Sequence, residues 1–201
     1  MRRIDLLRHG ESQWSNGYLR GSIDDELSVL GWAQMSASIQ SQLEQGCPWQ
    51  AVFSSPLQRC RLFAEDVAKQ QQRALYLDPN LQEIHFGDWE GESTQALYDR
   101  IPSQLAEFWQ QPTQFTPPNG EPLLVFQQRV LSAIQHIHQQ MVQSNLQHAL
   151  VVTHGGVIKL LKTIALAQPL DRLLSMSAEL GQLHHFELDV DAALYYQGIA
   201  K

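Results

Sequence analysis

The sequence predicts an α/β fold in which helices cover a mostly parallel sheet. Apolar runs of strand length at residues 4–7, 51–54 and 149–152 are each followed by a polar corner and then by a helical pattern. Strands that alternate with helices in this way are typical of parallel sheets. The corners after parallel strands gather at one edge of the sheet, where open α/β sheets bind ligands.

The first strand leads into a polar loop and then a helix. Residues 13–26 are polar and form the predicted loop. Ser28 is a suitable N-cap for a helix over residues 30–45.

The second unit repeats this order. After residues 51–54, Ser55 is expected to cap a helix that continues towards Gln72. Pro56 then takes the first helical turn, where its missing N–H costs nothing. Residues 74–77 predict a third short strand.

The middle of the chain predicts a small helical cap. Residues 94–111 indicate one or two short helices, broken at Pro102 and Pro112. We interpret residues 93–121 as a cap inserted over the sheet, within a single domain that spans residues 1–201.

The last third predicts a further unit. Apolar residues from Leu124 to Met141 recur at the spacing of one face of a long helix. The strand within residues 146–153 precedes a helix over 157–166, and residues 183–188 predict a late strand.

Composition limits the possible functions. Of the 201 residues, 43% are hydrophobic and 17% charged, which is typical of a globular protein. The formal net charge is −7 without a basic run, which argues against nucleic-acid binding, and no apolar stretch approaches the ~20 residues of a membrane span. Cys47 and Cys60 are the only cysteines, and no metal-type spacing links them. A disulfide framework is therefore not expected, and a cytoplasmic location is. The eight histidines form no metal-ligand set by spacing, so we expect neither metal nor cofactor.

The first corner carries Arg8, His9 and Gly10. It offers a fixed positive charge and a nucleophilic nitrogen to one incoming group, and glycine lets that group approach the backbone. The second corner carries Arg59 and Arg61, which point to different helix faces. We favour Arg59 for the site and Arg61 for solvent or an indirect contact.

The third corner carries His154 followed by Gly155 and Gly156 at a helix start. Free N–H groups at a helix N-terminus form an anion site, and glycines let the anion come close. Cations from three corners would repel one another unless an anion joined them. Arginine suits phosphate because it forms bidentate hydrogen bonds. The three corners together therefore predict a phosphate site.

Four motifs follow one another along the chain. They are Leu-Arg-His-Gly-Glu-Ser at 7–12, Ser-Ser-Pro-Leu-Gln-Arg at 54–59, Glu83 with Phe-Gly-Asp-Trp-Glu-Gly at 86–91, and Thr-His-Gly-Gly at 153–156. In this order they resemble the histidine phosphatase (phosphoglycerate mutase-like) superfamily. The resemblance implies a phosphoglycerate mutase-like, three-layer α/β/α fold with helices on both faces of the sheet.

The resemblance also implies the roles of five residues. His9 would be the nucleophile that becomes phosphohistidine, Glu83 the proton donor, and Arg8, Arg59 and His154 the groups that hold the phosphoryl group. Many members carry Asn six residues after the nucleophile, whereas here Ser15 stands at that position and Asn16 follows. Either of the two is a candidate phosphate ligand.

Chemistry supports these roles independently. A neutral imidazole can attack phosphorus, and phosphoryl transfer needs mainly positioning and positive charge, expected here from two arginines and a cationic His154. A phosphate dianion favours the protonated form of Glu83. The acid can then protonate the leaving alkoxide and afterwards activate water.

The substrate is expected to be a small phosphomonoester. Residues 83–91, 108–112 and 118–130 resemble α-ribazole-5′-phosphate phosphatases, which act in cobalamin nucleotide-loop assembly. Trp109 or Phe115 would then form a wall for the flat benzimidazole. Alternatives are a broad-specificity phosphatase, a phosphoglycerate mutase-type enzyme or a catalytically inactive binding module. A homodimer that pairs through strands after residue 180 is a further possibility.

Overall fold

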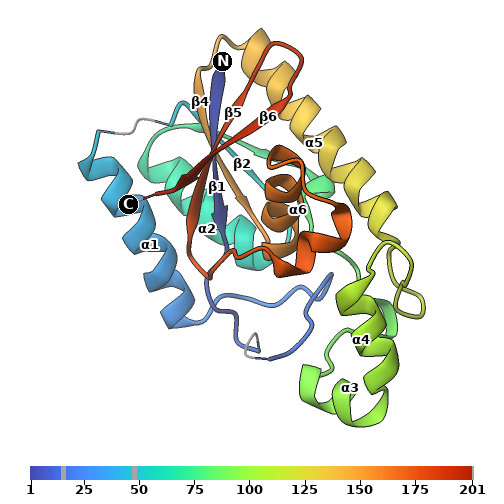
Figure 1. Cartoon of the computed structure of the whole chain (residues 1–201). Coiled ribbons are helices and arrows are strands. Elements are labelled where there is room, and N and C mark those ends of the chain that lie inside the picture. The colour runs from blue at the N-terminus through green and yellow to red at the C-terminus, as the bar shows by residue number, and fades with distance from the viewer. Residues whose placement is uncertain (15–16, 47–48, 201) are drawn as a thin grey trace.

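A six-stranded sheet forms the middle of the protein (Figure 1). The structure is a computed structural model and describes residues 1–14, 17–46 and 49–200. The strands lie in the order β3 (Ala74–Leu77), β2 (Ala51–Ser54), β4 (His148–Thr153), β1 (Arg2–Arg8), β5 (Leu183–Leu188) and β6 (Leu194–Ile199). The first four run parallel, and β5 and β6 are antiparallel to their neighbours. The prediction of a mostly parallel sheet is confirmed.

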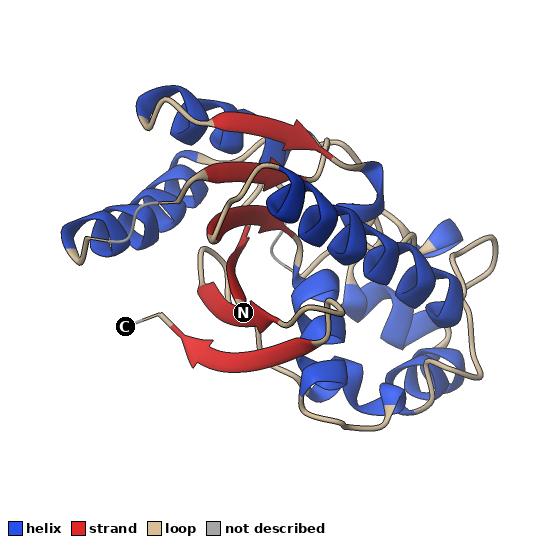
Figure 2. Cartoon of the chain, turned by 90° about the horizontal axis from the view of Figure 1, so that it is seen from above, coloured by secondary structure: helices blue, strands red, loops and turns tan. Residues whose placement is uncertain are grey.

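Helices cover both faces of the sheet, which confirms the three-layer arrangement (Figure 2). The helices are α1 (Val29–Glu44), α2 (Gln58–Gln70), α3 (Thr94–Arg100), α4 (Pro102–Gln110), α5 (Leu123–Gln143) and α6 (Gly155–Ala165). Short 3-10 turns lie at Pro79–Leu81, Gly87–Trp89 and Leu170–Ser175. The helices α1 and α2 pack on one face, and α5 and α6 pack on the other.

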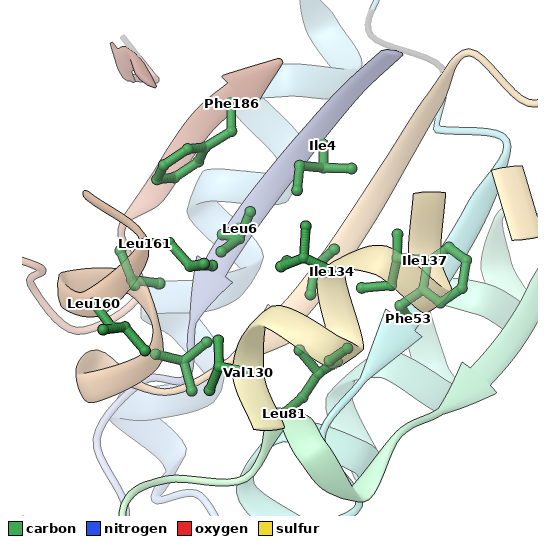
Figure 3. Close-up of a cluster of buried hydrophobic side chains, with 14 of the residues drawn as sticks. Ile4, Leu6, Phe53, Leu81, Val130, Ile134, Ile137, Leu160, Leu161 and Phe186 are labelled. Carbon is green, nitrogen blue, oxygen red and sulfur yellow. The ribbon is translucent and has the colours of Figure 1, made fainter. Parts of the chain in front are cut away.

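The side chains of β1 show why two faces are covered. Successive strand residues point to opposite faces, so Leu6 packs with α5 and α6 while Leu7 packs with α1 and α2. Figure 3 shows Leu6 facing Ile134 of α5 and Leu161 of α6. These side chains are almost completely buried, and each contributes about 1.5–3 kcal/mol to the free energy of unfolding because it is removed from water. They are Leu6, Leu7, Ile134 and Leu161.

The first helix begins where the sequence predicts. Ser28 is its N-cap, and the backbone N–H of Gly31 donates to the Ser28 hydroxyl over 3.0 Å. The second predicted cap is wrong, because α2 begins at Gln58, and Leu57 is its N-cap. The Ser55 hydroxyl lies against His154 instead, at 2.8 Å.

The helices α3 and α4 lie beyond the end of the sheet at which β1 ends (Figure 1). Their break at Pro102 is as predicted, since this proline opens α4. Leu97, Leu105 and Phe108 form a separate apolar cluster with Trp89. The predicted start of the last helix is two residues late, because α6 begins at Gly155.

Candidate active site

The three predicted corners meet at one cavity of about 460 Å³. It lies at the carboxyl ends of the parallel strands, the expected ligand edge of such a sheet. Arg8, His9, Arg59, Glu83 and Gly155 all line it. These predicted residues come from four separate segments of the chain, so the fold brings them together.

His9 stands directly after β1, with one ring nitrogen occupied. Its Nδ1 lies 2.7 Å from the carbonyl oxygen of Gly10. A carbonyl only accepts hydrogen bonds, so Nδ1 carries a proton and Nε2 of the neutral ring has a free lone pair. Burial lowers the pKa of His9 well below its ordinary value, and the charges of Arg59 and Arg8 lower it further. The ring is therefore a neutral nucleophile at pH 7.

Arg8 and Arg59 bring two guanidinium groups to the cavity. Arg8 donates through Nη1 to the carbonyl of Ala178, and Arg59 donates through Nη2 to the carbonyl of Gly21 over 2.7 Å. Arg59 also pairs with Asp25 at 3.1 Å. The Nε–H groups of both arginines are buried and have no hydrogen-bond partner among the described residues.

Two orphaned donors beside one cavity call for an acceptor. An unsatisfied buried donor costs about 1–3 kcal/mol, and more when it is charged. Burial also lowers the pKa of Arg8, with Arg59 adding to the effect. An anion in the cavity would accept from both groups and relieve their repulsion.

His154 lies beneath the cavity, not on its lining. The residue is 0% exposed, its ring centroid is 5.2 Å from that of His9, and the planes meet at 64°. Burial lowers its pKa well below the ordinary value, and nearby Arg59, His9 and Arg8 lower it further. The expectation of a cationic His154 is therefore wrong, because a low-dielectric pocket among cations disfavours a further charge.

Glu83 occupies the helix N-terminus that was predicted to bind the anion. Its Oε2 accepts the N–H of Gly156 in α6 over 3.0 Å, and its Oε1 accepts the N–H of Ile84 over 3.0 Å. A Cβ on Gly156 would come within 2.1 Å of Oε1, and one on Gly155 within 3.0 Å of Arg8 Nε. The glycines let Glu83 and Arg8 approach the helix, in addition to any role towards an anion.

Of the carboxylates in residues 83–90, only Glu83 lines the cavity. Asp88 accepts from the side-chain amide of Asn119 at 3.0 and 3.1 Å. Glu90 accepts from the backbone N–H and the hydroxyl of Ser22, both at 2.8 Å. Asp88 and Glu90 therefore hold loops, which leaves Glu83 as the candidate acid of the cavity.

Arg129 holds the loop that leads to Glu83, a role that was not predicted from the sequence. Arg129 of α5 donates to the carbonyls of Asn80, Gln82 and Glu83 at 2.8–2.9 Å and pairs with Glu121 at 2.6 Å. Arg129 and Glu121 flank the start of α5, an arrangement that spacing alone does not connect to the loop before Glu83.

Lys159 is a further cavity residue that the sequence did not single out. It lies three residues after Gly156, so both occupy one face of α6. No hydrogen bond or ion pair holds its ammonium within the described ranges 1–14, 17–46 and 49–200. Burial lowers its pKa, and Arg8 adds to this. The sequence feature that could have identified Lys159 is a lysine between apolar residues of a predicted helix.

The outer wall of the cavity is apolar and aromatic. Phe86, Phe108 and Trp109 line it, with Trp109 42% exposed. Phe115 is not on this wall, since it stacks on Trp89 at 5.8 Å within the α3–α4 cluster. Of the two predicted wall residues, the structure therefore places only Trp109 there.

Some expectations fall outside what the structure describes. Ser15 and Asn16, the alternative phosphate ligands, lie outside the described residues. Within residues 1–14, 17–46 and 49–200, no group of three or more His, Cys, Asp or Glu side chains could hold a metal ion. In the same part of the chain, no helix has the length and apolar character needed to cross a bilayer.

Comparisons with known proteins agree with this geometry. The family model of the histidine phosphatase superfamily (branch 1) matches residues 4–194. The adenosylcobalamin/alpha-ribazole phosphatase of Escherichia coli (strain K12) is 31% identical over 194 residues, covering 93% of this chain and 85% of that protein. The 2,3-bisphosphoglycerate-dependent phosphoglycerate mutase of Bartonella henselae is 27% identical over 165 residues, covering 80% and 79%.

A solved structure shows the same fold. The alpha-ribazole phosphatase of Shigella flexneri matches with a TM-score of 0.80 and 24% identity, covering 99% of this chain and 96% of that chain. The architecture is thus that of the phosphoglycerate mutase-like phosphatases.

Proposed function

Because this chain belongs to the histidine phosphatase superfamily, we propose that it hydrolyses small phosphomonoesters through a phosphohistidine formed at His9. The observation that carries the proposal is the pair of orphaned Nε–H groups of Arg8 and Arg59 beside His9. They supply the donors that a phosphoryl group needs, next to an imidazole nitrogen with a free lone pair.

In the first step, His9 Nε2 attacks phosphorus and the bond to the ester oxygen breaks. Arg8, Arg59 and Gly155 at the start of α6 hold the charge of the phosphoryl oxygens. Glu83, protonated in the presence of the phosphate dianion, gives its proton to the leaving alkoxide. His9 then carries the phosphoryl group, and the alcohol departs.

In the second step, water takes the phosphoryl group from His9. The Glu83 carboxylate accepts the proton of the attacking water, the N–P bond breaks, and phosphate leaves. His9 and Glu83 return to their starting protonation states. The backbone N–H groups of Ile84 and Gly156 hold the carboxyl group of Glu83 at the cavity.

Two variants test this mechanism. His9→Ala removes the nucleophile and should abolish turnover of p-nitrophenyl phosphate. Glu83→Gln keeps the size but loses the proton, and should lower kcat by at least about 10²-fold. Full activity of His9→Ala would reject the mechanism and favour the binding-module alternative.

For the substrate, we propose α-ribazole 5′-phosphate. The apolar wall of Phe86, Phe108 and Trp109 suits a flat aromatic base. The similarity to the Escherichia coli enzyme covers 93% of this chain and supports the same choice. In this proposal residues 93–121 act as the cap that carries Phe108 and Trp109, within a single domain of residues 1–201.

A second candidate substrate is a phosphorylated hydroxy acid. The observation that favours it is Lys159, a cavity cation beyond the two arginines that a phosphate dianion needs. A carboxylate on the leaving group would pair with this ammonium. The phosphoglycerate mutase of Bartonella henselae is the relative that suggests this class.

A substrate panel separates the candidates. We expect kcat/KM to be highest for α-ribazole 5′-phosphate, compared with 3-phosphoglycerate and p-nitrophenyl phosphate. A preference for 3-phosphoglycerate would replace the first candidate by the second. Equal values for all three would indicate a broad-specificity phosphatase.

A further inference from the structure

Ser55 and His154 form a fully buried pair at the base of the cavity. Ser55 follows β2 and His154 follows β4, and these neighbouring parallel strands bring the two side chains together. The backbone N–H of Ser55 donates to the carbonyl of Val152 over 3.0 Å, which extends the pairing past the end of β2. The Ser55 Oγ then lies 2.8 Å from His154 Nε2.

The hydrogen bonds of the Ser55 hydroxyl fix the direction of this contact. The N–H of Leu57 donates to Ser55 Oγ over 3.3 Å, so one lone pair of the hydroxyl is already used. His154 Nε2 is the remaining acceptor for the hydroxyl proton in the described part of the chain. If Nε2–H donated instead, the buried hydroxyl proton would have no acceptor, at a cost of about 1–3 kcal/mol.

The other polar neighbour of the ring does not select a nitrogen. Cys60 Sγ lies 3.6 Å from Nε2 and 3.9 Å from Nδ1 of His154, nearly the same distance from both. Its better-defined contact is with the carbonyl of Thr153, at 3.5 Å. Burial raises the pKa of the Cys60 thiol, so the sulfur carries no charge that would hold a proton on either nitrogen.

We propose that Ser55 is a positioning residue that donates its hydroxyl proton to His154 Nε2 and so holds the proton of the neutral imidazole on Nδ1. Nδ1 is then the only ring nitrogen of His154 that can donate, and in the proposed function it would donate to the phosphoryl group on His9, whose ring centroid lies 5.2 Å away. In the opposite tautomer Nδ1 would carry a lone pair, which cannot donate to an anion and is repelled by one. The use of Nδ1 for catalysis rests on the proposed function, whereas the tautomer itself does not.

The tautomer can be measured directly by nitrogen-15 NMR of the whole protein labelled at histidine, at pH 7. A protonated and an unprotonated ring nitrogen resonate far apart, and the His154 signals are identified by their loss in His154→Gln. We expect the unprotonated nitrogen to be Nε2. A wild-type spectrum with the proton on Nε2 would overturn the proposal, whatever the variants do.

Ser55→Ala adds the functional readout, and Ser54→Ala is its matched control. Ser54 is equally buried, but its hydroxyl donates to the Ser55 carbonyl at 2.9 Å and not to His154. In Ser55→Ala we expect the His154 proton to move wholly or partly to Nε2, and kcat to fall up to about tenfold with little change in KM. Ser54→Ala should keep the wild-type tautomer and kcat.

The results also separate this proposal from the proposed function. An unchanged tautomer and unchanged kcat in Ser55→Ala would reject Ser55 as a positioning residue. If instead the tautomer shifts while His9→Ala stays fully active, the Ser55 contact stands and the phosphohistidine mechanism fails. If Ser55→Ala does not fold, the wild-type spectrum alone decides the tautomer.

Discussion

At the scale of single residues, the contacts of each group decide its chemistry. His9 can act as the proposed nucleophile because the Gly10 carbonyl holds the proton on Nδ1, at 2.7 Å, and because burial keeps the ring neutral. Glu83 is held by two backbone N–H groups, those of Ile84 and Gly156, which keep its carboxyl group beside the cavity. In the proposed mechanism, the charge of a bound phosphate dianion favours the protonated form of Glu83, so the acid forms when substrate binds.

Gly156→Ala tests the contact between α6 and Glu83. An alanine Cβ would come within 2.1 Å of Glu83 Oε1, so the flexible carboxylate must move away from the Gly156 N–H. We expect kcat to fall at least tenfold. The melting temperature should change little. Alanine favours a helix over glycine by up to about 1 kcal/mol, which offsets the loss of the hydrogen bond between Gly156 N–H and Glu83. Wild-type kcat in this variant would contradict the account of Glu83.

Lys159→Met tests the cavity cation that would bind the carboxylate of the second candidate substrate, a phosphorylated hydroxy acid. Methionine keeps most of the length without the charge, and a charge-assisted hydrogen bond is worth about 1.5–3 kcal/mol. We expect kcat/KM for 3-phosphoglycerate to fall roughly 10- to 100-fold, with little change for glycerol 1-phosphate, which lacks the carboxylate. Equal losses for both would place Lys159 on the transferred phosphate instead.

At the scale of elements, the segments that follow the parallel strands β1, β2, β3 and β4 carry the residues of the site, and α5 holds one of these segments in place. Arg129 of α5 holds the loop before Glu83 by three carbonyl contacts and an ion pair with Glu121. A planar guanidinium can bind several acceptors in fixed directions, whereas lysine cannot. The helix thereby fixes the position of the acid relative to His9.

Arg129→Lys should therefore misplace Glu83 while keeping the charge. We expect kcat for p-nitrophenyl phosphate to fall about tenfold and the free energy of unfolding to fall by about 1–3 kcal/mol, since buried carbonyls lose donors. Arg61→Lys is the control, because Arg61 pairs with Glu65 on an exposed face at 2.8 Å, a contact worth about 0–1 kcal/mol. Equal effects in both variants would contradict the role of Arg129.

The elements also show what sequence can and cannot predict. The runs at 51–54 and 149–152 were predictable because fully buried parallel strands need continuous apolar residues. The cap assigned to Ser55 was wrong because its hydroxyl partner, His154, lies 99 residues away. The positions of Arg129 and Lys159 in the site were not predicted for the same reason, because they depend on which segments the fold places beside them.

At the scale of the whole molecule, neutral buried histidines make stability depend on pH. The pKa of His184 falls from 6.5 to about 4, chiefly because of burial, and those of His9 and His154 are also lowered. Such groups are neutral in the folded protein and take up protons in the unfolded chain. Their contribution to the free energy of unfolding is therefore fully present above pH 6.5 and is lost as the pH falls.

Burial alone would raise the pKa of Asp5, but hydrogen bonds from His148, His185 and Arg3 outweigh it and lower the pKa. Its stabilising effect is therefore complete above its unfolded value near 3.9 and is lost at lower pH. This effect has the same sign as that of the histidines, at a more acidic pH.

Urea unfolding at pH 7.5 and pH 5 measures the histidine effect. We expect a lower free energy of unfolding at pH 5, with His184 contributing about 2 kcal/mol of the loss. His184→Gln should reduce the loss by that amount, whereas His136→Gln, whose side chain is 63% exposed, should not. Equal stability of the wild type at both pH values would contradict this account.

The proposed mechanism requires that His9 carries the phosphoryl group on Nε2. Phosphorus-31 NMR of the denatured phosphoenzyme, trapped by rapid quenching in alkali, distinguishes Nε2- from Nδ1-linked phosphohistidine. We expect one acid-labile Nε2-linked species in the wild type, because Nδ1 of His9 is bound to the Gly10 carbonyl, and none in His9→Ala. A phosphoryl group on Nδ1, or turnover without any phosphohistidine, would contradict it.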